Sequence, residues 1–183
     1  HGDLREALVM AAVELLEEKG LASFTLRECA RRAGVSHAAP AHHFASAADL
    51  LAEIAARGFE RFVAALGEAA DETEGTAMAQ LAAMGRAYVA FALANPAVYG
   101  LMFRGGANPL QSPRLKTAAT AAWQQLSDAV AAVLGPKRQD EVTAKAAAVW
   151  ALVHGTATLM LDCKLPPGPA RSSDPVAQIL SSL

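Results

Sequence analysis

The fold is decided by residues 25–44, which read TLRECARRAGVSHAAPAHHF. Thr25 is followed three residues later by Glu28, the spacing of a capping box at a helix start. Apolar residues then recur at positions 26, 29, 30 and 33, which lie on one helix face. Gly34 ends this helix, and a second short helix is expected from Ser36, as its N-cap, to about His43. The stretch therefore predicts two short helices joined by a tight turn, the helix-turn-helix unit.

Small and polar side chains make up the outer face of the second expected helix. A helix-turn-helix unit lays that helix in the DNA major groove, where alanine contacts thymine methyls and serine or histidine bonds base edges. Thr25 and Arg27 begin the first helix and are expected to hold a phosphate. The predicted DNA-binding residues are Thr25, Arg27, Ser36, His37, Ala38, Ala39, Ala41, His42 and His43.

The amino-acid composition indicates the fold class of the whole chain. The 183 residues are 53% hydrophobic and include 44 alanines, so a packed, all-helical protein is expected. The net charge of −2 excludes a strongly basic chain, so any DNA-binding surface must be local. Residues 25–43 supply it, with three arginines against one glutamate.

Glycine, proline and acidic breaks delimit the other helices. We predict an N-terminal helix-turn-helix domain over residues 1–46, a connecting helix at about 47–70, and a C-terminal antiparallel bundle over 71–183. Ser46 and Asp49 cap the connecting helix. The expected helices are 3–19, 25–33, 36–43, 47–70, 77–94, 96–104, 114–134 and 138–163, with a short one after Asp174.

The same residues carry a family resemblance. Residues 25–36, followed by His42-His43-Phe44, resemble the DNA-binding domain of the TetR family of transcriptional repressors, in register over about the first 60 residues. Residues 150–155, Trp-Ala-Leu-Val-His-Gly, resemble the Trp-His-Gly motif of one TetR subgroup's C-terminal domain. The resemblance implies a homodimer that binds a near-palindromic operator. It also implies release of the DNA when a small apolar molecule enters the C-terminal bundle and changes the spacing of the two reading heads.

Two positions depart from the family's pattern. Ala41 stands where relatives usually carry an aromatic residue, often tyrosine, and Ala47 stands where they tend to carry lysine. In the family, both residues contact backbone phosphate. Losing two such contacts is expected to weaken DNA binding and to flatten its salt dependence. We therefore expect a modest operator affinity, or one that depends on residues preceding His1.

Bulky side chains in the alanine-rich bundle are either core residues or the lining of an apolar effector pocket. Trp150 and His154 lie four residues apart on one helix face, so they form a pocket wall or a core tryptophan beside a hydrogen-bonded histidine. The predicted pocket residues are Met84, Tyr88, Phe91, Met102, Phe103, Trp123, Trp150 and His154. The family implies dimerisation through the helices at about 114–134 and 138–163.

Other classes of site and function are disfavoured. The longest uncharged apolar run, residues 146–161, has 16 residues and falls short of a membrane span. Cys29 and Cys163 lie far apart, so both are expected to be small buried groups. The histidines at 37, 42 and 43 lack metal-ligand spacing, so no metal or cofactor is expected. The start of the chain has no signal-peptide pattern, and a cytoplasmic protein is expected.

Two rival functions are weighed against the regulator. One is a helical small-molecule or protein-binding module with weakened or lost DNA binding, which the alanines at 41 and 47 favour. The other is a helical enzyme using His154 with Asp162 or Cys163. The sequence shows no nucleophile–base set and no phosphate-cradling glycine loop, so we predict that the chain is not an enzyme.

Overall fold

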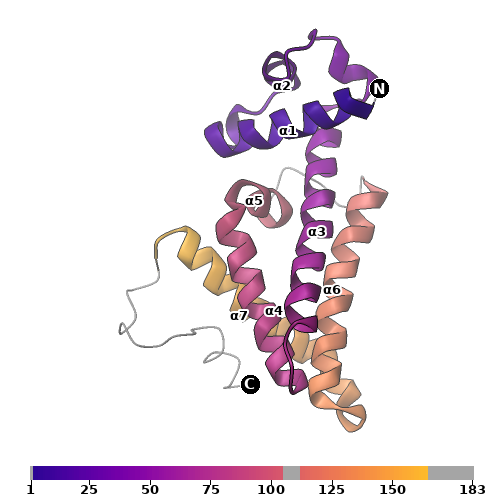
Figure 1. Cartoon of the computed structure of the whole chain (residues 1–183), viewed down its shortest axis with the longest axis vertical. Coiled ribbons are helices and arrows are strands. Elements are labelled where there is room, and N and C mark those ends of the chain that lie inside the picture. The colour runs from indigo at the N-terminus through magenta and orange to yellow at the C-terminus, as the bar shows by residue number, and fades with distance from the viewer. Residues whose placement is uncertain (1, 105–111, 165–183) are drawn as a thin grey trace. The chain divides into compact units, whose positions relative to one another are not determined.

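The computed structural model describes residues 2–104 and 112–164. This part of the chain holds seven α-helices, three short 3₁₀ segments and no strand, which confirms the all-α class (Figure 1). The α-helices are α1 (Gly2–Lys19), α2 (Leu26–Arg32), α3 (Ala47–Asp71), α4 (Ala77–Ala94), α5 (Pro96–Arg104), α6 (Pro113–Leu134) and α7 (Val142–Leu161). The helix expected after Asp174 lies outside the described residues.

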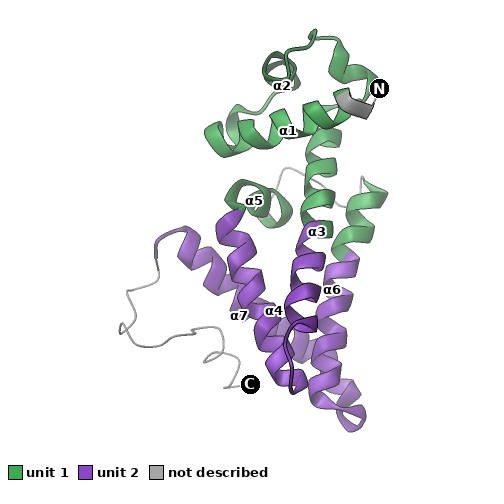
Figure 2. Cartoon of the chain, viewed as in Figure 1, with its two compact units in different colours: residues 1–60, 95–119 green, residues 61–94, 120–183 purple. Residues whose placement is uncertain are grey.

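The helices cluster into two compact units (Figure 2). Unit 1 combines His1–Glu60 with Asn95–Ala119, and unit 2 combines Arg61–Ala94 with Thr120–Leu183. Residues of α5 and of the start of α6 therefore group with the helix-turn-helix region, although they lie far from it in the sequence. The domain limits predicted at residues 46 and 71 remain a prediction.

The core of unit 1 is built on α1, which packs against α2 and α5. One face of α1 is apolar and buried, with Leu8, Ala12 and Leu15 fully inaccessible. Gly58 of α3 allows α5 to come close, since a Cβ there would lie 2.8 Å from both Met102 Sδ and Val98 Cγ1. Tyr99 of α5 is fully buried in the same core.

Caps and glycine turns set the helix ends in unit 1. Thr25 Oγ1 accepts a hydrogen bond from the Glu28 backbone N–H at 3.2 Å, which confirms Thr25 as the N-cap. The Glu28 carboxylate, which would complete the predicted capping box, instead accepts from Arg31 and Lys19. Ser46 Oγ likewise accepts from the Asp49 N–H at 3.2 Å. Gly34 follows α2 with a φ of 70°, a left-handed conformation that favours glycine.

The core of unit 2 is a helical bundle in which α4 packs against α7. On α7 the buried residues Ala146, Val149, Val153 and Ala157 recur at helical spacing. The Phe62 ring of α3 makes edge-to-face contacts with Tyr88, at 5.0 Å between ring centroids, and with Phe91, at 5.3 Å. Aromatic side chains therefore fill the centre of an otherwise alanine-rich bundle.

Within residues 2–104 and 112–164, two helical segments are long and apolar enough to cross a membrane by length and composition, although the 16-residue run alone predicted none. They are Ala77–Ala94 and Pro136–Leu161, and in each of them a window of 18 residues has a mean hydropathy of 1.3. Core helices of soluble proteins pass the same test, and 44% of the first segment is buried inside the protein. Only 28% of the apolar window in the second segment is buried, so this window leaves much apolar surface uncovered.

Candidate nucleic-acid interface and effector site

The segment expected to enter the groove is shorter and tighter than predicted. It forms a 3₁₀ helix, η2 (Ala39–His42), in place of an α-helix over residues 36–43. The cause is Pro40, which has no N–H to donate and is fully buried. Ser36 is not a side-chain cap, because its carbonyl, rather than its hydroxyl, receives the Ala39 N–H at 3.0 Å.

Two buried residues hold the reading segment, which we define as residues 36–44. Pro40 lies in the core, and its carbonyl accepts the N–H groups of His43 at 2.9 Å and Phe44 at 2.8 Å. The Phe44 ring is buried, and the Arg5 guanidinium lies 5.0 Å from its centroid. The backbone of the reading segment is thus anchored while most of its side chains remain outside.

The predicted DNA-binding residues are largely accessible. Ala39 and His43 are half-buried. The exposed ones are Thr25, Arg27, Ser36, His37, Ala38, Ala41 and His42. Ala41 therefore offers the solvent only a methyl group, and Ala47, the first residue of α3, is half-buried. Neither alanine side chain supplies a hydrogen-bond donor for a phosphate.

The three arginines of α2 are not equivalent. Arg27 is exposed, and no described residue forms an ion pair with it. Arg31 donates to both oxygens of Glu28, at 2.9 and 2.7 Å. Arg32 pairs with Glu18 of α1 and, at 3.4 Å, with Glu14.

These ion pairs shrink the cationic surface that the sequence count predicted. The hydrogen bond from Arg31 and then that from Lys19 lower the pKa of Glu28 to about 2, so this carboxylate stays charged. On the basic side, the hydrogen bond that Arg32 donates to Glu18 raises the pKa of Arg32. Counting charges along residues 25–43 missed the glutamates of α1, which reach α2 only in the folded chain.

Four of the predicted pocket residues form a row of rings in unit 2. The Tyr88 hydroxyl of α4 is hydrogen-bonded to His154 Nδ1 of α7 at 2.8 Å. The His154 ring lies 6.1 Å from Trp150, which in turn lies 6.2 Å from Trp123 of α6. Tyr88 is buried, His154 is half-buried and Trp150 is 41% exposed.

The other predicted pocket residues divide between the units. Met84 and Phe91 are buried on α4 in unit 2, where Phe91 meets Phe62, a ring that the sequence did not single out. Met102 and Phe103 belong to α5 in unit 1. Phe103 packs on Phe59 and Tyr99, with centroid distances of 5.3 and 4.9 Å. The structure therefore does not gather all eight residues into one compact unit.

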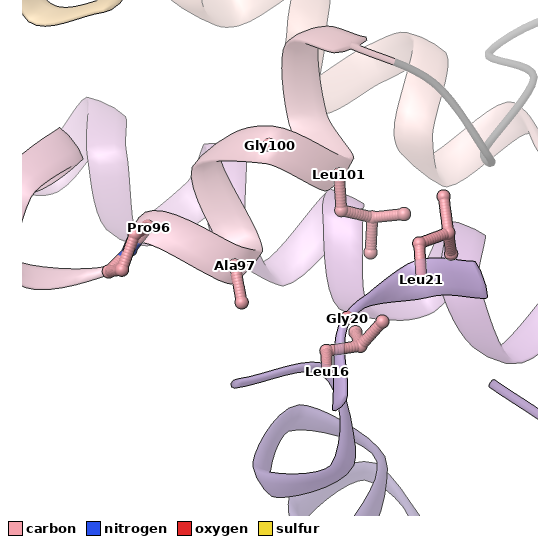
Figure 3. Close-up of a pocket in the computed structure, with 7 residues that line it drawn as sticks. All are labelled: Leu16, Gly20, Leu21, Pro96, Ala97, Gly100 and Leu101. Atoms are coloured by element: carbon pink, nitrogen blue, oxygen red, sulfur yellow. The ribbon is translucent and has the colours of Figure 1, made fainter. Parts of the chain in front are cut away.

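An open groove of about 270 Å³ lies in unit 1, between the end of α1, the following 3₁₀ turn η1 (Leu21–Ser23) and α5 (Figure 3). Its lining is Leu16, Gly20, Leu21, Pro96, Ala97, Gly100 and Leu101. None of the predicted pocket residues takes part in it. No sequence pattern signalled this groove, because it depends on the packing of α5 against α1.

Neither cysteine suggests a metal site. Across residues 2–104 and 112–164, no group of three or more His, Cys, Asp or Glu side chains could hold a metal ion. Burial raises the pKa of Cys29 to about 11, as expected for a small core residue. The expectation is wrong for Cys163, which is exposed with a φ of 53° just after α7. There the Lys164 N–H bonds the Leu159 carbonyl at 2.8 Å, a helix-terminating turn that turns Cys163 outward.

The fold and the site define an all-helical protein with an N-terminal helix-turn-helix. Comparison with protein families gives two matches. Residues 8–54 match the bacterial regulatory proteins of the tetR family, and residues 81–182 match the tetracyclin repressor-like C-terminal domain. The chain belongs to the TetR family. Proteins of this family are transcriptional regulators rather than enzymes, and they generally bind DNA in response to small ligands. The assignment to a Trp-His-Gly subgroup remains a prediction.

Solved structures share the fold over 96–100% of the chain. A protein of unknown function from Rhodococcus sp. RHA1 is 35% identical, with a TM-score of 0.82 over 100% of this chain and 92% of its own. The TetR family regulator PfmR from Thermus thermophilus is 21% identical, with a TM-score of 0.67 over 96% and 93%. The fatty acid degradation regulator FadR from Bacillus halodurans is 18% identical, with a TM-score of 0.73 over 98% and 95%. No curated protein sequence matches the chain.

Proposed function

We propose that the chain is a repressor that binds a palindromic operator as a homodimer and is released by a small apolar molecule. The observation that carries this proposal is the reading segment, whose backbone is anchored by Pro40 and Phe44 while small and polar side chains face outward. A rigid, slim segment of this kind suits insertion into the major groove. A cytoplasmic location follows from this role.

In this proposal, one set of residues contacts the bases of the DNA and another set contacts its phosphates. His37 and His42 contact base edges, and the methyl groups of Ala38 and Ala41 meet thymine methyls. Arg27 contacts a phosphate, since it is exposed and is not held by a described carboxylate. Thr25 adds its hydroxyl, which can still donate while it accepts the Glu28 N–H.

The homodimer is proposed to form through α6 and α7, within the helices predicted at about 114–134 and 138–163. The solvent-facing side of α7 carries Leu152 and Leu159, each at least 36% exposed. No charged residue lies between Lys145 and Asp162. Burying this surface against a second copy removes apolar area from water. To bind two half-sites one turn of DNA apart, the dimer must hold its two reading segments about 34–36 Å apart.

The effector is proposed to bind in unit 2 beside the Tyr88–His154 pair. Ligand sites in helical bundles are mainly apolar with a few polar groups that fix orientation. The hydroxyl of the buried Tyr88 and the half-buried ring of His154 are such groups, and Met84, Phe91 and Trp150 supply apolar surface on the same two helices. A ligand that favours one spacing of the reading heads shifts the population toward it.

Binding to the DNA upstream of the chain's own gene tests the proposal. We expect saturable binding to that DNA and much weaker binding to a scrambled duplex. Arg27→Ala should weaken both by a similar factor and lower the salt dependence, because it removes a phosphate contact. Arg31→Ala is the matched control, since Arg31 is already paired with Glu28. His37→Ala should instead alter the sequence preference.

A module without DNA binding is the second candidate function. It is favoured by the pairing of Arg31 and Arg32 with carboxylates and by the alanines at 41 and 47, which leave few cationic contacts. Absent binding, or equally weak binding, to both the upstream and the scrambled duplex at physiological salt would favour this candidate and refute the repressor.

A further inference from the structure

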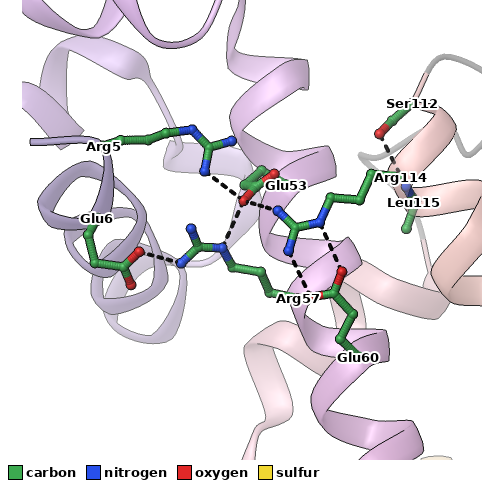
Figure 4. Close-up of polar contacts among 8 residues, drawn as sticks. All are labelled: Arg5, Glu6, Glu53, Arg57, Glu60, Ser112, Arg114 and Leu115. Carbon is green, nitrogen blue, oxygen red and sulfur yellow. Dashed lines mark hydrogen bonds and ion pairs between the residues drawn. The ribbon is translucent and has the colours of Figure 1, made fainter. Parts of the chain in front are cut away.

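A buried carboxylate in unit 1 receives three guanidinium groups on one oxygen atom (Figure 4). Glu53 Oε1 of α3 accepts from Arg5 of α1 at 2.9 Å, from Arg57 of α3 at 2.8 Å and from Arg114 of α6 at 2.6 Å. Glu53 is only 8% exposed. Burial by itself would raise the pKa of this carboxyl, but the hydrogen bonds of Arg5 and Arg57 and the charge of Arg114 lower it to about 2.

Two further glutamates complete what we call the Glu53 cluster. Arg57 Nη1 donates to Glu6 of α1 at 2.6 Å. Arg114 donates to both oxygens of Glu60, at 2.9 and 2.8 Å. The Glu53 cluster thus contains three arginines and three glutamates from three helices, and their charges cancel. Arg114 bridges two carboxylates, which requires the forked geometry of its guanidinium.

The Glu53 cluster reaches the reading segment through Arg5. The Arg5 guanidinium, which bonds Glu53, also lies 5.0 Å from the centre of the Phe44 ring. Phe44 closes the reading segment, because its N–H bonds the carbonyl of Pro40 at 2.8 Å. A continuous line of contacts therefore runs from the first turn of α6 to the segment proposed to read DNA.

We propose that Arg114 is a positioning residue for the reading segment: through Glu53 and Arg5 it holds Phe44, and with it residues 36–43, in place. The physical reason is that Arg114 and Arg5 share one acceptor oxygen. Displacing Arg114 alters both the geometry and the field that Arg5 experiences. Any displacement of the start of α6 is thereby passed to the reading segment. This inference rests on the proposed function, because the segment has a role only if the chain binds DNA.

Hydrogen exchange in the free, full chain tests the positioning role directly. The reporter is the Phe44 amide, which Arg114 does not touch. We expect Arg114→Gln and Arg114→Lys each to speed its exchange about fivefold, the size of effect expected for side chains that share a partner. The lysine variant keeps the charge and the fold but cannot bridge Glu53 and Glu60. Arg5→Gln should have a similar effect, and the Arg5→Gln/Arg114→Gln double variant should exchange no faster than Arg5→Gln alone.

Two controls separate positioning from a general loss of stability. Arg138→Gln breaks a comparable two-bonded ion pair, with Glu141 in unit 2, and should leave the Phe44 amide unchanged. The amide of the fully buried Leu15 should keep its slow exchange in every single variant. Unchanged Phe44 exchange in both Arg114 variants, or effects that add in the double variant, would overturn the inference. Failure to bind an operator would instead refute the proposed function, since exchange is measured without DNA.

Discussion

Glu53→Gln is the substitution that tests the energetics of unit 1 most sharply. In the folded chain the carboxyl has a pKa of about 2, against its ordinary value of 4.5. That difference corresponds to about 3 kcal/mol of stability at neutral pH. Glutamine removes the charge while three guanidinium groups remain, of which Arg57 and Arg114 keep their other glutamates. We therefore expect Glu53→Gln to lower the free energy of unfolding by about 3 kcal/mol at pH 7.

The pH dependence supplies a second signature. Because folding lowers this pKa, the stabilisation is complete above the ordinary value and is lost as pH falls toward the folded value of about 2. Between pH 7 and pH 3, the difference in stability between the natural chain and Glu53→Gln should shrink by about 2 kcal/mol.

Urea denaturation followed by circular dichroism at both pH values measures this effect. The matched control is Glu141→Gln, which breaks the exposed pair with Arg138 and should leave the unfolding midpoint nearly unchanged. A cost below about 1 kcal/mol for Glu53→Gln at pH 7, with no change at pH 3, would refute this account of the Glu53 cluster.

Three other substitutions probe packing, assembly and capping. Gly58→Ala should destabilise the chain by about 1–3 kcal/mol in urea, because the new Cβ lies 2.8 Å from Met102 and Val98, whereas Gly100→Ala adds a methyl in open space and should not destabilise it. Leu159→Lys should convert the proposed dimer into a monomer, as measured by light scattering, because it places a charge on the uncovered side of α7. An unchanged molecular mass would show that the interface lies on another surface. Thr25→Ala should cost about 1 kcal/mol in the same urea assay by removing the cap of α2, and a loss of less than a few tenths would show that the cap contributes little.

Local signals in the sequence predicted most of the helices. Caps and glycine stops depend on neighbouring residues, so Thr25, Ser46 and Gly34 fixed the helix limits that the structure confirms. The 3₁₀ form of the reading segment was not predicted, although the missing N–H of Pro40 is a local signal. The burial of Pro40, the other cause of this form, is a property of tertiary packing that the sequence did not show.

The sequence predicted which residues of the candidate site are exposed. It did not predict which charged residues form ion pairs with one another. Thr25, Arg27 and His37 are exposed as the helix-turn-helix pattern implied. The glutamates that pair with Arg32 come from another helix, and the partners of Glu53 are as many as 61 residues away. Long-range ion pairs of this kind leave no periodic signal in a sequence. The same limit applies to α5, whose Met102 packs near Gly58 in unit 1.

Selection from a library of random DNA duplexes shows whether the chain recognises an operator as a dimer. The full chain is incubated with the library at physiological salt, and the bound duplexes are sequenced over successive rounds. A dimeric operator-binding protein predicts enrichment of one inverted repeat, with half-site centres about 10 base pairs apart or a multiple of that spacing. Failure to enrich any sequence, or enrichment of a motif without two-fold symmetry, would contradict the account.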